Sequence, residues 1–187
     1  MNPENFPDKI TRAQLELMNT FRLLWEQHDV WTRATISSLV FALPDVEPVV
    51  ARLLRNPEDF EMGLSPFYGR RTAAQFRELL QEHLLLAADI ITASKEGDEE
   101  AAQEAKRLWY ANAEAIADFL SSINPFWSRR LWQRMMFAHL DLVLEEAVTM
   151  LRGDYQVSVS VYDEIELQSL MMADEMSRGI IAQFHIR

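Results

Sequence analysis

The segment Leu24–Leu39, LWEQHDVWTRATISSL, places a histidine at the centre of an apolar helix face. Because an α-helix turns by about 100° per residue, the position of each side chain around the axis follows from its number. Leu24, Thr32 and Thr35 fall within about 40° of His28, and Trp31 flanks it at about 60°. The segment therefore predicts a long helix that carries His28 along its apolar stripe.

Polar residues take the same place on other predicted helices. His83, His139 and Asn112 each occupy the middle of an apolar face, and Ser169 does so more weakly. Counted from the intervening turns at 1.5 Å per residue, Asn112 and His139 lie within about 3 Å of one level, and His83 and Asn112 within about 6 Å. Three of the four histidines are thus predicted to approach one another in the core. The proline-rich segment that follows hides the register of the first helix.

Composition favours one all-α domain over residues 1–187. Apolar residues make up 49% of the chain, whereas glycine occurs only five times and no long β-branched runs are present. The fold we expect is a four-helix bundle of the ferritin-like, up-down type with an additional C-terminal helix and a short proline-rich helical crossover. Residues 1–9 read as a loose lead-in, and no internal sequence repeat is evident. The expected helices span residues 11–43, 46–55, 71–94, 98–122, 128–151 and 158 or 160–184.

Helix boundaries follow from capping residues. Thr11 and Ser128 are expected N-caps, and Asp98 caps the helix that follows the stop at Gly97. Asn56 is read as a further N-cap with proline at the first helical position. Ser158 or Ser160 is expected to cap the last helix.

The histidines admit two interpretations. Neutral imidazole is a common transition-metal ligand, so His28, His83 and His139, with Glu146 two turns beyond His139, could hold one ion of zinc, iron or manganese. Asn112, Trp31, Trp109 and Ser169 would then contact a small polar ligand. The alternative is a polar layer that only fixes packing in a helical interaction module. Glu-x-x-His pairs, which di-iron bundles use, are absent.

Charge limits the partners. A net charge of −11 disfavours nucleic acid and acidic membrane surfaces, and no apolar run is long enough to span a bilayer. The absence of cysteine excludes thiolate sites and agrees with a reducing compartment, so a cytoplasmic protein is expected. A row formed by Arg22, Glu26 and Arg33 reads as solvated or as lying between subunits, and a homodimer is expected.

Several strings, among them LWEQHDVWTR, RLLRNPEDF, PFYG and LWYANAEAIADFLSSINPFW, resemble a family of uncharacterised bacterial all-helical proteins. The similarity spans nearly the whole chain. Members of that family often carry the name acetylglutamate kinase. Such kinases are α/β proteins with glycine-rich phosphate loops, and the isolated glycines of this chain form no such loop, so kinase activity is rejected.

Overall fold

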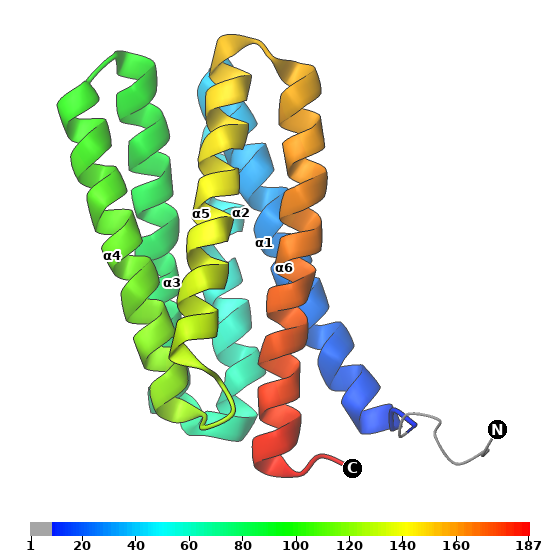
Figure 1. Cartoon of the computed structure of the whole chain (residues 1–187). Helices are drawn as coiled ribbons and strands as arrows, with labels where there is room; N and C mark the ends of the chain where they lie inside the picture. Colours follow the sequence, from blue (N-terminus) through cyan, green and yellow to red (C-terminus); the bar gives the residue numbers. More distant parts are fainter. Residues whose placement is uncertain (1–8) are drawn as a thin grey trace.

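The protein is all-helical in its computed structural model, which describes residues 9–187 (Figure 1). No strand occurs in this range, and none of its helices combines the length and apolar character that crossing a bilayer requires. The all-α class is confirmed, whereas the ferritin-like four-helix arrangement stays a prediction. The expected lead-in lies almost wholly outside the described residues. The helices are α1 (Arg12–Phe41), α2 (Val46–Leu54), α3 (Asn56–Glu96), α4 (Glu99–Ile123), α5 (Arg129–Arg152) and α6 (Tyr155–Phe184).

Most helix ends follow the local capping chemistry. The Thr11 side chain accepts a bond from the backbone of Gln14, whose side chain bonds back to Thr11, so α1 begins with a capping box. Asp98 and Ser128 cap α4 and α5 as predicted. The expected N-caps of the last helix were wrong, because α6 begins at Tyr155, directly after the turn that closes α5.

Helix α3 is much longer than the predicted helix over residues 71–94. It begins at Asn56, and proline at its second position is compatible with a first helical turn because that N–H has no partner in the helix. Asn56 is not an N-cap, since Arg55 precedes the helix and the Asn56 side chain is turned into the core. Gly69, with φ 77° and ψ 158°, breaks α3 into a first part (56–68) and a second part (70–96).

The helices form three consecutive hairpins. In Figure 1, α1, the second part of α3 and α5 run in one direction, and the first part of α3, α4 and α6 return in the other. Each outgoing helix ends in a left-handed residue, Ala42, Gly97 or Gly153, and these positions are 55 and 56 residues apart. A period of 55–56 residues therefore divides the chain into three similar units.

Core positions repeat with the same period, although the residue types differ. In each unit, the residue seven positions before the core histidine is a buried aromatic side chain. Asn56, Asn112 and Gln168 each bond one of these histidines, and the residue four positions after each of them is a large buried apolar side chain. All six side chains are at most 2% exposed. The repeat is thus one of burial pattern, which explains why it was not evident in the sequence. The two sets are Phe21, Phe76 and Trp132, and Phe60, Ile116 and Met172.

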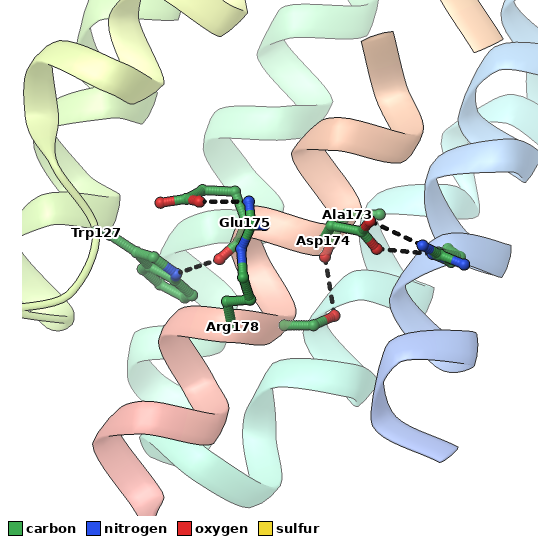
Figure 2. Close-up of polar contacts among 7 residues, drawn as sticks. Trp127, Ala173, Asp174, Glu175 and Arg178 are labelled. Carbon is green, nitrogen blue, oxygen red and sulfur yellow. Dashed lines mark hydrogen bonds and ion pairs between the residues drawn. The ribbon is translucent and has the colours of Figure 1, made fainter. Parts of the chain in front are cut away.

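Polar contacts hold α6 in place between α1 and the α4–α5 turn (Figure 2). Arg22 of α1 donates two bonds, of 2.7 and 2.8 Å, to the Asp174 carboxylate, and the Trp127 indole N–H donates to the Glu175 carbonyl oxygen at 3.2 Å. Arg33 of α1 pairs with a carboxylate on α5. The two arginines of the predicted charge row therefore pair within the chain, and the Arg22 side chain stays 44% exposed, as expected for a solvated group.

Candidate metal centre

Each of the three core histidines is held by an amide side chain from the returning half of its hairpin. His83 shows the arrangement most fully: its Nδ1 lies 3.0 Å from Oδ1 of Asn112. Nδ2 of Asn112 donates to the carbonyl oxygen of Leu79 at 3.1 Å and to the Glu82 carboxylate at 2.9 Å. Because neither partner can donate, the amide nitrogen must face them, and the amide oxygen must face the histidine.

The same motif recurs at the other two histidines. In every case the amide nitrogen donates to the carbonyl oxygen four residues before the histidine, and the amide oxygen faces Nδ1. His28 uses Asn56, with distances of 3.2 Å to Nδ1 and 2.9 Å to the Leu24 oxygen. His139 uses Gln168, with distances of 3.0 Å to Nδ1 and 2.9 Å to the Met135 oxygen.

These bonds fix the tautomer of the imidazoles. An amide oxygen can only accept, so each Nδ1 carries the proton, and each Nε2 keeps its lone pair. Burial, opposed by the Asn56 bond, lowers the pKa of His28 to about 4. Burial and the nearby His28 lower the pKa of His139 to about 3, and burial with both neighbouring histidines lowers that of His83 to about 3. All three rings are therefore neutral at pH 7.

The structure brings His28 and His139 into direct proximity. Their ring centroids are 5.6 Å apart, and both side chains are 2% exposed. One donor atom from each, with one from Asp29, lies within 4.8 Å of the others. A tetrahedral ion bound at about 2.1 Å needs donors about 3.4 Å apart, so these donors would have to approach one another by up to about 1.4 Å to hold one ion. His83 is equally buried, but its donor atoms do not belong to this group.

The remaining predicted site residues take several roles. Asn112 orients His83, and Trp109 packs against that ring with centroids 5.1 Å apart. Ser169 donates to the Asp29 carboxylate at 2.9 Å. Trp31 lies away from the histidines, under the Arg52 guanidinium at 4.9 Å.

Glu146 is buried but is bound to Arg33 rather than grouped with the histidines. Burial, opposed by the Arg33 charge, raises the pKa of Glu146 to about 7. The Arg33 guanidinium also lies 4.7 Å above the Tyr162 ring. This side of the core, between α1, α5 and α6, thus contains a second polar cluster next to the histidines.

Sequence reasoning missed Asp29, Asn56 and Gln168. Asp29 was overlooked because it lies 100° from His28 on the helix, off the apolar stripe. The two amides could have been found from spacing, since residues 56, 112 and 168 are each 56 residues apart and each follows a histidine by 28 or 29. No family model matches the chain, and neither curated proteins nor solved structures provided a match.

Proposed function

We propose that the core of this protein binds one transition-metal ion through Nε2 of His28, His83 and His139. The observation that carries the proposal is the repeated motif in which an amide side chain bonds both a histidine and a backbone carbonyl. In all three units this bond keeps the proton on Nδ1 and leaves the lone pair of Nε2 free to bind a metal. Metal-binding histidines commonly donate their other ring N–H to such an oxygen, which fixes the tautomer and the ring orientation.

The donor chemistry narrows the choice of ion. Three neutral imidazoles suit zinc and iron, and manganese is accepted when oxygen ligands are added. Three protein nitrogens leave a coordination position for water or for a small polar ligand, so Lewis-acid and redox chemistry are both accessible to such a centre. Asn112, which the sequence suggested as a ligand-binding residue, supports His83 in this proposal.

The alternative function is a helical interaction module, expected as a homodimer, whose polar layer only fixes packing. One observation favours it: every Nδ1 already has an amide partner within its own hairpin. Buried polar groups satisfied in this way can specify register without any ligand. The two functions differ in what a cation does to stability.

Metal binding is tested on protein purified without an affinity tag. Elemental analysis and titration with Co²⁺ should give one ion per chain. The melting temperature should rise with metal and fall with chelator, since a ligand present at a hundred times its Kd stabilises by about 2.7 kcal/mol. His139→Leu should lose most of this response, whereas His185→Leu, at an exposed histidine, should keep it. Identical melting curves for wild type with chelator and with zinc, iron, manganese or cobalt would leave the structural function in place.

A further inference from the structure

Position 29 breaks the internal repeat. The residue directly after the histidine is buried in each of the three units, and in the other two it is leucine. The first unit has Asp29, which is 1% exposed. Leucine is therefore the residue that this fold ordinarily accommodates here, and the carboxylate is an exception that needs a reason. The equivalent leucines are Leu84 and Leu140.

The carboxylate of Asp29 is incompletely satisfied. Oδ1 accepts one bond, from the Ser169 hydroxyl at 2.9 Å, and Oδ2 is buried without a partner among the described residues. Burial raises the pKa of Asp29 well above its usual range, and the carboxylates of Glu26, Glu146 and Glu166 add to this rise. A buried carboxylate with a free oxygen and like-charged neighbours destabilises a fold. Packing therefore gives no reason for an aspartate at this position.

The position of Asp29 gives a reason. Together with His28 and His139 it forms the one group of three or more metal-ligating side chains found within residues 9–187, with donor atoms within 4.8 Å of one another. We propose that Asp29 is an oxygen ligand of the same ion, bound through Oδ2, and that Ser169 orients the carboxylate through Oδ1. This inference rests on the proposed function.

A carboxylate ligand from Asp29 changes the chemistry of the proposed metal site. Three nitrogens and one anionic oxygen form a complete tetrahedral set, and a fifth position would be needed for water. A carboxylate favours the harder divalent ions zinc, iron and manganese over copper(I), which prefers sulfur ligands. A divalent cation would also compensate the negative charges of Glu26 and Glu166, which contribute to the raised pKa of Asp29.

Two replacements separate a ligand from a packing residue. Asp29→Leu installs the side chain of the other two units, and Asp29→Asn is nearly isosteric. Without metal, both variants should melt at a higher temperature than wild type, because the unfavourable carboxylate is gone. Both should bind Co²⁺ more than about 100-fold more weakly, which exceeds the usual effect of an outer-shell change, and the visible spectrum of bound cobalt should change.

Two further variants serve as controls. Ser169→Ala leaves all ligands in place and should weaken Co²⁺ binding by about 10-fold, with little spectral change. Glu166→Gln removes a neighbouring charge from the same region and should change affinity only a few-fold.

The outcomes separate this inference from the proposed function. If wild type takes up no cobalt, the metal centre itself is wrong. If wild type binds cobalt and Asp29→Asn binds it equally tightly with the same spectrum, the centre stands without Asp29. Lower melting temperatures for both metal-free position-29 variants would show that the fold needs this carboxylate, which contradicts the inference.

Discussion

Replacing Gly179 with alanine should destabilise the protein by forcing a buried tryptophan out of place. A Cβ at Gly179 would lie 1.9 Å from Nε1 of Trp127 and 2.3 Å from its Cδ1. The indole would have to retreat by about 1.5 Å to reach ordinary van der Waals contact. It has little room, because it is 2% exposed and packs against Tyr68 and Trp132 with centroids 5.6 and 6.1 Å away.

The magnitude follows from three contributions. Overpacking costs about 1–3 kcal/mol, and loss of the bond from Trp127 to the Glu175 carbonyl costs about 0.5–1.5 kcal/mol. Alanine regains about 1 kcal/mol because it favours the helix more than glycine does. The net loss should be about 2 kcal/mol, or about 4–8 °C in melting temperature.

Gly63→Ala is the matched control, since Gly63 also lies within a helix. Its added Cβ would lie 3.3 Å from the end of the flexible Leu24 side chain, so the helix preference should make this variant as stable as wild type or slightly more so. Urea unfolding of both variants measures the difference. If Gly179→Ala proves no less stable than Gly63→Ala, the close packing of Trp127 on α6 is wrong.

In the metal-free protein, ¹⁵N NMR at pH 5.5 should show His28, His83 and His139 neutral, with the proton on Nδ1. A charged or Nε2-protonated ring would contradict the amide motif. Asn112→Leu should weaken metal binding about 10–100-fold and cost about 1–3 kcal/mol, measured by titration and urea unfolding. The pKa of Glu146 is about 7 in the folded state and 4.5 in the unfolded state. The stability that this residue contributes is therefore fully present below pH 4.5 and is lost as the pH rises to about 7. That loss, about 3 kcal/mol, should be absent from the pH profile of Glu146→Gln, and an unchanged profile would refute it. Analytical ultracentrifugation should detect a dimer at tens of micromolar, and a monomer alone would remove the support for an interaction module.

The sequence predicted the features that depend on local chemistry. The N-cap at Thr11 and the left-handed stop at Gly97 involve residues only a few positions apart, so the sequence contains the whole signal. Asn56 followed by proline gave the same kind of local signal, but its side chain instead bonds His28 and the Leu24 carbonyl. A distant partner there outweighed the local preference.

Asp29 shows the other limit of sequence reasoning. A helical wheel identifies the face that meets the core, but α1 is covered by several neighbours, and its buried face is wider than one stripe. The contact between Asp29 and Ser169 depends on how α6 packs against α1, which neither helix pattern specifies. The repeat of 55–56 residues was hidden for a similar reason, because burial is conserved between the units while residue type is not.

The amide–histidine motif is also local to each hairpin. Each histidine is oriented by a residue 28 or 29 positions later, within its own hairpin. The orientation of each imidazole therefore depends on bonds within a single hairpin and not on contacts between hairpins. An ion bound by His28, His83 and His139 would link the three hairpins. It should therefore slow their separation from one another, whereas the rate at which each hairpin forms should be unchanged.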